Sequence, residues 1–310
     1  MAIEHAGKRV SLVLGAGGAR GLAHIGVVEV LSERGYRLAG IAGSSMGALV
    51  GGIHAAGRLN LYREWACALE RSSTLRLLDF SFGFPGLIRG DKLMGALREL
   101  VGDRPIEELA VPFTAVATDI RAQREVWLNR GSLFDAIRAS IAIPMIFTPH
   151  RIDGRDLVDG GLLAPMPIAA SRQVRSDLVI AVDVNSSPAP KPAALEAPPA
   201  AAEPSAESEG YRARITGFIE SIADSFSDDE APPKGPAPLG LIDLMSRSLD
   251  TMQGQIARMQ LALDPPELLI RMPRDRCMFY EFWRASEMIA LGRDSAEAAL
   301  DEYEALNGGS

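Results

Sequence analysis

Short apolar runs alternate with segments of helical periodicity along most of the chain. Residues 9–14 form a β-branched apolar run that stops at glycines, which is typical of a buried parallel strand. After a glycine loop, Ile25, Val28 and Leu31 recur at helical spacing, and the next apolar run, at 38–42, leads at once into a segment of small residues. Strand, glycine turn and helix repeated in this order predict βαβ units and a parallel sheet.

The same patterns predict the other elements of a three-layer α/β/α fold with a mainly parallel central sheet. The segment at 80–90 is an aromatic, glycine-rich loop between two helical patterns. We expect further strands at residues 113–119, 125–128, 178–184 and 268–272, and one that ends at 157–158. We expect further helices at residues 59–71, 91–101, 133–139, 239–263, 280–291 and 294–306.

The composition changes after residue 186. Residues 187–202 and 228–238 are mostly proline, alanine and polar residues, which bury too little apolar surface to offset the entropy of ordering. Between them, residues 212–226 carry five apolar side chains on one helical face, namely Ile215, Phe218, Ile219, Ile222 and Phe226. This predicted amphipathic helix is either an interfacial anchor or lid, or a helix that docks on its own domain.

Three parts follow from these changes in pattern. We expect a catalytic core at 8–186, a flexible insertion rich in proline and alanine at 187–238, and C-terminal helices with one strand at 239–307 that complete the same domain.

Charge and cysteine content narrow the functional classes. The 310-residue chain has a formal net charge of −8, which argues against nucleic-acid binding. Cys67 and Cys277 lie far apart and lack metal-ligand spacing, so neither a disulfide framework nor a metal or other cofactor is expected. We see no signal peptide and no apolar run long enough to cross a bilayer. We expect a cytoplasmic protein, with peripheral contact at the inner membrane face left open.

Residues 43–47 read Gly-Ser-Ser-Met-Gly between a predicted strand and a predicted helix. A serine at such a turn has a strained backbone, and Gly43 and Gly47 let strand and helix approach each other. The hydroxyl of Ser45 is thereby exposed at the C-terminal edge of the sheet. The amide of Met46, at the helix N-terminus, faces developing negative charge. This arrangement predicts that Ser45 is a nucleophile.

A second glycine loop, residues 15–21, precedes another predicted helix. The third glycine of a dinucleotide fingerprint is replaced by Arg20, and the lysine that ends a Walker A loop is missing. The backbone N–H groups of Gly17 and Gly18 are unobstructed, which favours binding of an oxyanion. A tight turn that only packs helix against strand is the alternative.

A serine nucleophile needs a base, and the four histidines offer no good candidate in the expected chain order. His54 lies about two turns beyond Ser45 on the predicted elbow helix and points away from the active edge. His24 is more typical of a packed or capping histidine. A carboxylate that acts directly on the serine is the remaining option.

Asp159 is the first candidate for that carboxylate. It ends a predicted strand and precedes two glycines, which suits a residue at the active edge of the sheet. Asp-Gly is also a very common turn pair. Asp119 and Asp183 end predicted strands as well and compete for the role.

Four segments in order, LVLGAGGARGLAHIG, GSSMG, RASIAIPMIFTP and LVDGGLLAPMPI, resemble the patatin-like phospholipase family. The resemblance is greatest to its bacterial branch, related to the catalytic domain of neuropathy target esterase, and covers residues 8–186, with weaker family character at 239–292. It implies a patatin-like fold and a catalytic pair without histidine. The serine of GxSxG and the aspartate of Asp-Gly-Gly correspond to Ser45 and Asp159.

The resemblance also implies an oxyanion hole in the glycine loop, at Gly17 and Gly18, with Arg20 as the basic residue of the loop. Two positions depart from the family pattern: Ala16 replaces a frequent glycine, and Ala164 stands where an asparagine is frequent. Neither change removes the catalytic pair. The supporting glycines of the motifs are Gly15, Gly21, Gly43, Gly47, Gly160 and Gly161.

The implied activity is that of a serine acyl hydrolase that cleaves carboxylic esters of lipids, as a phospholipase A, a lysophospholipase or an esterase. An acyl-enzyme on Ser45 would form and then be hydrolysed by water. Acyl transfer to another acceptor by the same pair stays open. A nucleotide-binding or regulatory module that uses residues 15–21 is the alternative from a different functional class.

Overall fold

The computed structural model describes residues 7–77, 79, 88–187 and 241–307. Chain contacts define two compact units, residues 1–188 with 252–310, and residues 189–251. The described part of the second unit is the N-terminal portion of helix α9 (Leu241–Leu263). The predicted amphipathic helix at 212–226 lies outside the described residues, so its role stays a prediction.

Within the described residues, eight strands form one mixed sheet in the order β5-β6-β3-β2-β1-β7-β8, and β4 also pairs with β3. Strands β3, β2, β1, β7 and β8 are parallel to one another, whereas β4, β5 and β6 add antiparallel pairs. The strands are β1 (Arg9–Leu14), β2 (Arg37–Ser44), β3 (Phe113–Asp119), β4 (Arg124–Leu128), β5 (His150–Ile152), β6 (Arg155–Asp159), β7 (Leu178–Ser186) and β8 (Leu268–Pro273). The predicted fold class is confirmed.

Helices cover both faces of this sheet. The α-helices are α1 (Ala23–Glu33), α2 (Met46–Ala55), α3 (Leu59–Cys67), α4 (Arg71–Arg76), α5 (Asp91–Val101), α6 (Leu133–Ser140), α7 (Ile168–Ser171), α9 and α10 (Ala285–Asn307). Short 3₁₀ helices are η1 (Gly18–Leu22), η2 (Ile106–Glu108), η3 (Gly160–Leu162), η4 (Arg274–Arg276) and η5 (Phe282–Arg284).

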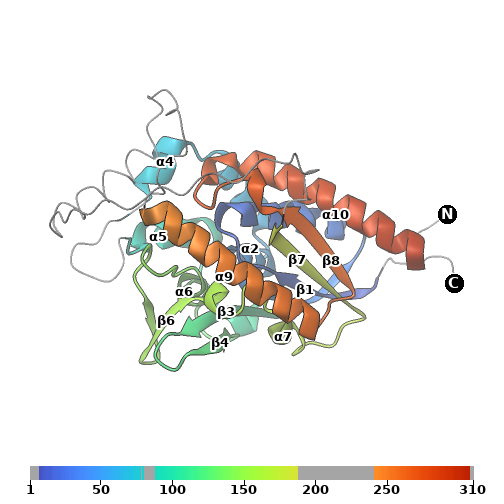
Figure 1. Cartoon of the computed structure of the whole chain (residues 1–310), viewed down its shortest axis with the longest axis horizontal. Helices are drawn as coiled ribbons and strands as arrows, with labels where there is room; N and C mark the ends of the chain where they lie inside the picture. Colours follow the sequence, from blue (N-terminus) through green and yellow to red (C-terminus); the bar gives the residue numbers. More distant parts are fainter. Residues whose placement is uncertain (1–6, 78, 80–87, 188–240, 308–310) are drawn as a thin grey trace, which may run out of the picture. The chain divides into compact units, whose positions relative to one another are not determined.

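Side chains of β1 show how the core is divided between the two faces. Leu12 and Leu14 join the larger apolar cluster, which includes buried residues of α1, α2 and α10. Val13 points to the other face and packs with Ile168 of α7 and Ala257 of α9. Figure 1 shows β1, β7 and β8 side by side, with α10 along β8. The chain therefore has the expected three layers.

Three elements differ from the sequence expectation. The helix expected at 59–71 ends at Cys67 as α3, and a separate helix, α4, begins at Arg71, where the Glu70 amide donates a hydrogen bond to the Ser73 hydroxyl. The two helices expected at 280–291 and 294–306 are one helix, α10, because Gly292 is not a break but a contact point against the Ala23 backbone of α1.

Strand β5 is a further difference, since no strand was expected at 150–152. It forms a hairpin with β6 in which Ile152 pairs with Arg155 across the two residues Asp153 and Gly154. Both turn residues have positive φ, 48° and 77°, which is the geometry of a two-residue turn that Asp-Gly favours. The Asp-Gly pair was therefore a usable signal for this hairpin.

The register along β3 brings two strand ends together. Ala115 pairs with Gly43 of β2 and with β4, whereas Ala117 pairs with Asp159 of β6 and with β4. Because β4 pairs with one edge of β3 from Ala115 to Asp119, β2 and β6 must share the opposite edge, one after the other. The last residue of β2, Ser44, pairs with Val116, next to the position that pairs with Asp159. The C-terminal ends of β2 and β6 therefore meet.

Substitution of Gly160 by alanine tests this meeting point. A Cβ at position 160 would overlap the carbonyl of Val116 and lie 2.6 Å from the Ser44 hydroxyl. We expect Gly160→Ala to lower the free energy of unfolding by about 1–3 kcal/mol through overpacking, measured by denaturant titration. Gly95→Ala is the matched control, because a Cβ there has no neighbour within 4 Å and alanine favours helix α5. Equal stability of the two variants would contradict the described register.

Candidate active site

Ser45 occupies the sharp turn between β2 and α2. Its φ and ψ are 55° and −124°, a left-handed region that a non-glycine residue rarely adopts. The two flanking glycines are required by close contacts, since a Cβ on Gly47 would overlap the carbonyl of Leu14 and one on Gly43 would lie 2.6 Å from the Ala48 amide nitrogen. The predicted elbow geometry is thus present in the backbone.

The strained turn is anchored by Ser140, which the sequence analysis did not single out. The amide of Ser45 donates to Ser140 Oγ at 2.9 Å, and that hydroxyl donates to the carbonyl of Val116 at 2.6 Å. Ser140 ends α6, so this helix is connected through one hydroxyl both to the turn and to β3. Its place in the segment RASIAIPMIFTP was the only signal in the sequence.

Asp159 lies directly opposite Ser45. The Ser45 hydroxyl donates to Asp159 Oδ2 at 2.6 Å, and the amide of Gly161 donates to Asp159 Oδ1 at 2.7 Å. The backbone of Asp159 is held as well, because its amide donates to the Ala142 carbonyl and its carbonyl accepts from the Thr118 hydroxyl. Both carboxylate oxygens are therefore engaged and the side chain is fixed in one orientation.

The pair is almost completely shielded from solvent. Asp159 is 1% exposed and Ser45 is 4% exposed, so the serine lies at the expected edge of the sheet but is buried there, contrary to the expectation of an exposed hydroxyl. Burial disfavours the charged carboxylate and raises the pKa of Asp159 to about 7, although the hydrogen bonds from Ser45 and Gly161 act in the opposite direction. A carboxyl group with this pKa can both accept and return a proton near neutral pH, and it contacts a hydroxyl that can act as a nucleophile.

The competing carboxylates are engaged elsewhere. Asp119 Oδ1 accepts hydrogen bonds from the amides of Arg121 and Ala122 in the turn after β3. Asp183 Oδ1 accepts from the amide of Asn185 near the end of β7. Of the three candidate acids, the structure brings only Asp159 into hydrogen-bond contact with Ser45.

The histidines in the described part of the chain have other surroundings. His24 Nε2 hydrogen-bonds the Gly15 carbonyl at 2.9 Å, and complete burial lowers the pKa of His24 to about 4, so the ring is neutral at pH 7. His54 lies in the last turn of α2, and His150 lies 3.4 Å from Asp135. His24 thus forms a hydrogen bond with the glycine loop and not with Ser45.

The carbonyls of the glycine loop are held by side chains. Asn185 Nδ2 donates to the Ala16 carbonyl at 2.8 Å, and Arg20 Nε donates to the Gly17 carbonyl at 3.1 Å. A trans peptide directs its N–H opposite to its C=O, so these two contacts also orient the N–H groups of Gly17 and Gly18. Neither amide donates to a protein acceptor in the described ranges. Gly18 has φ of +55°, a conformation that favours glycine.

The loop packs against residues that follow both members of the pair. A Cβ on Gly21 would lie 2.6 Å from Met46 Cβ, and one on Gly47 would lie 2.8 Å from the Gly15 carbonyl. On the other side, a Cβ on Gly161 would lie 2.9 Å from Ala16 Cβ. The amide of Met46, like those of the loop, has no acceptor among the described residues. The structure therefore gathers all three predicted motifs in one place.

The described residues contain neither a metal-binding cluster nor a membrane-spanning helix. No group of three or more His, Cys, Asp or Glu side chains is placed to hold a metal ion. None of the described helices combines the length and the apolar character needed to cross a membrane.

Replacement of Asp159 by asparagine makes the burial of the carboxyl group measurable. The folded protein binds the proton of the Asp159 carboxyl group more tightly than the unfolded chain does. The free energy of unfolding should therefore fall as the pH rises from about 4 to about 7. The contribution lost over this window is on the order of 4 kcal/mol. We expect the stability of wild type relative to Asp159→Asn, measured by denaturant titration, to decrease by several kcal/mol across it. A pH-independent difference would contradict the raised pKa.

Comparison with known proteins adds independent information. The sequence model of the family described as patatin-like phospholipase matches residues 12–171. An uncharacterized NTE family protein of Mycobacterium tuberculosis is 43% identical over 96% of this chain and 92% of its own length. Human patatin-like phospholipase domain-containing protein 6 is 34% identical over 58% of this chain, which corresponds to 14% of that protein.

Among solved structures, VipD from Legionella pneumophila matches 97% of this chain and 67% of its own, with a TM-score of 0.41 and 14% identity. The assignment rests on the sequence comparisons alone. Because the family model matches about half of the chain and the mycobacterial relative is similar along nearly all of it, this chain belongs to the patatin-like phospholipase family.

Proposed function

We propose that this protein is a serine acyl hydrolase that cleaves carboxylic esters of lipids, with Ser45 as nucleophile and Asp159 as general base. The observation that carries the proposal is the 2.6 Å hydrogen bond between the hydroxyl of a strained serine and a buried carboxylate. Membership of the patatin-like phospholipase family supports lipid hydrolysis in a broad sense. The assignment of the two residues and of the ester class is our inference.

In the proposed first step, Ser45 Oγ attacks the ester carbonyl carbon while Asp159 accepts the hydroxyl proton. The tetrahedral intermediate collapses to an acyl-serine, and the departing alcohol takes its proton from Asp159. In the second step, water transfers a proton to Asp159 and attacks the acyl carbon, and the fatty acid is released as Ser45 Oγ departs and takes the proton back from Asp159. A pKa near 7 suits a group that must gain and lose a proton in each step.

The developing oxyanion needs donors that are oriented before the reaction begins. We assign this role to the amides of Gly17, Gly18 and Met46, which donate to no protein acceptor among the described residues. In this proposal Asn185 and Arg20 are positioning residues, because each holds the carbonyl of a peptide whose N–H faces the opposite way. They act through the loop backbone rather than on the substrate.

Labelling with a fluorophosphonate probe tests the nucleophile. We expect wild type to react and Ser45→Ala to be unreactive, with turnover of a soluble nitrophenyl ester reduced by about 10⁴-fold or more. Ser44→Ala is the matched control, because the buried Ser44 hydroxyl has no hydrogen-bond partner within the described ranges and should be dispensable. Labelling of Ser45→Ala, or its absence in wild type, would exclude the proposal.

The positioning role of Asn185 can be separated from a purely structural one. We expect Asn185→Ala to lower kcat for the nitrophenyl ester by about 10–10²-fold, with KM nearly unchanged, because the Gly17 N–H loses its orientation. Asn129→Ala, at an exposed asparagine bonded to Gln173, should behave like wild type. A rise in KM at constant kcat in Asn185→Ala would show that Asn185 serves binding and not the oxyanion.

A further inference from the structure

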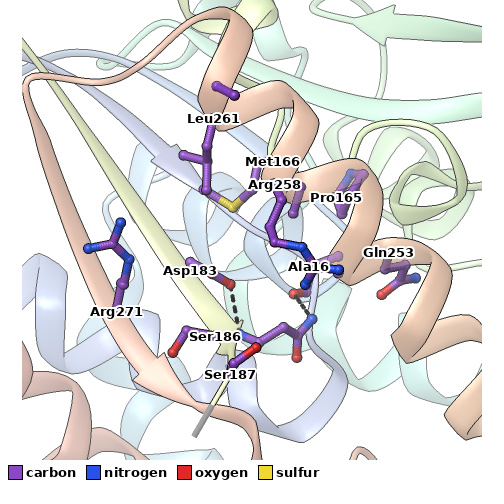
Figure 2. A pocket seen from close by; sticks show the side chains of 14 residues that line it. Ala16, Pro165, Met166, Asp183, Ser186, Ser187, Gln253, Arg258, Leu261 and Arg271 are labelled. Atoms are coloured by element: carbon purple, nitrogen blue, oxygen red, sulfur yellow. Dashed lines mark hydrogen bonds between the residues drawn. The ribbon is translucent and has the colours of Figure 1, made fainter. Parts of the chain in front are cut away.

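A cavity of about 420 Å³ opens beside the glycine loop. Its walls come from the last residues of β7, from Arg271 of β8, from residues 253–262 of α9 and from Ala16 of the loop. Figure 2 shows these side chains converging from α9, β7 and β8. All of the lining residues belong to the first compact unit. Two lining residues, Ala16 and Asn185, also take part in the proposed oxyanion hole, whereas the proposed mechanism gives the rest of the cavity no role.

The cavity adjoins the Ser45–Asp159 pair. A Cβ on Gly161 would lie 2.8 Å from Gln253 Nε2 and 2.9 Å from Ala16 Cβ, both in lining residues. This Cβ on Gly161 would also lie 2.9 Å from Asp159 Oδ1. Gly161 therefore lies between two residues of the cavity wall and the Asp159 carboxylate.

Positive charge predominates among the lining residues. Arg258 and Arg271 face a single acid, Asp183, which Figure 2 draws between them. One oxygen of Asp183 already accepts a hydrogen bond from the Asn185 amide, and burial raises the pKa of this carboxyl group. Arg258 donates one hydrogen bond to Gln255 and carries further N–H groups. The two guanidinium groups thus outweigh the acid in charge and in donors.

The lining also lacks the features that bind a quaternary ammonium group. The described lining residues include no aromatic ring, and Asp183 is their only acid. A volume of about 420 Å³ is near the lower end of the roughly 300–1,000 Å³ typical of ligand sites, which suits a small head group better than an acyl chain. Guanidinium groups match phosphate oxygens with paired hydrogen bonds.

We propose that this cavity is a head-group subsite in which Arg258 and Arg271 bind the phosphate of an anionic lipid ester, while the ester carbonyl lies at Ser45. The inference rests on the proposed hydrolase function. The subsite selects head groups that end in phosphate, or in phosphate with a neutral extension, over head groups in which a choline neutralises the phosphate.

Kinetics with three substrates of identical acyl chain test the subsite: a lysophospholipid with a free phosphate, its phosphocholine counterpart and a monoacylglycerol. We expect wild type to favour the free phosphate in kcat/KM. The double variant R258Q/R271Q should lose about 10–10²-fold on that substrate, mainly through KM, and less than about twofold on monoacylglycerol. Arg175→Gln, an exposed arginine outside the cavity lining, is the control and should match wild type.

An equal loss on all three substrates in the double variant, or a wild-type preference for the phosphocholine substrate, would overturn the proposal.

A measurement of ligand binding, which needs no turnover, makes the test independent of catalysis. In the Ser45→Ala background, glycerol phosphate should raise the thermal unfolding midpoint, and R258Q/R271Q should abolish that shift. An equal shift with inorganic phosphate would indicate a free-anion site and overturn the head-group assignment. If wild type turned over none of the three substrates but still showed the glycerol phosphate shift and its loss in R258Q/R271Q, the result would count against the hydrolase function alone.

Discussion

Strands β2 and β6 end against each other on one edge of β3, and the candidate site depends on that contact. β2 runs parallel to β3 and β6 runs antiparallel to it, so both carboxyl ends point to the same place. Ser45 follows one end and Asp159 is the other, which explains how residues 114 positions apart share a 2.6 Å hydrogen bond. Gly160 is needed because the two ends leave no room for a Cβ.

The same contact places a carboxyl group where water cannot reach it. Burial makes ionisation of Asp159 unfavourable, and Asp159 is the residue to which the proposed mechanism assigns the general base. The surrounding backbone is correspondingly rigid, since Ser140 holds the serine turn and Asn185 and Arg20 hold the glycine loop. In the proposed mechanism this rigidity matters, because donors that are oriented in advance toward a developing charge need no reorganisation during the reaction.

Much of the architecture could be predicted from local pattern. Buried parallel strands are continuous apolar runs, and glycine turns separate them from amphipathic helices, so the βαβ order and the fold class were readable. The errors arose where tertiary contacts override local signals. Two helices were expected at 280–291 and 294–306, yet Gly292 lies inside the single helix α10, where the Ala23 backbone of α1 approaches it closely. The β5 strand is too short to show periodicity, although its Asp-Gly turn was visible.

The sequence by itself determined Ser45 as the candidate nucleophile, because an elbow is a local structure whose strand, glycines and helix are adjacent in the chain. It also located the glycine loop and reduced the candidate bases to acids at strand ends. Only the tertiary structure distinguished Asp159 from Asp119 and Asp183 by contact, since sheet register is set by non-local pairing. Ser140, Asn185 and the arginines of the cavity became visible only in the fold, because hydrogen bonds and cavities between distant segments leave no periodic trace in the chain.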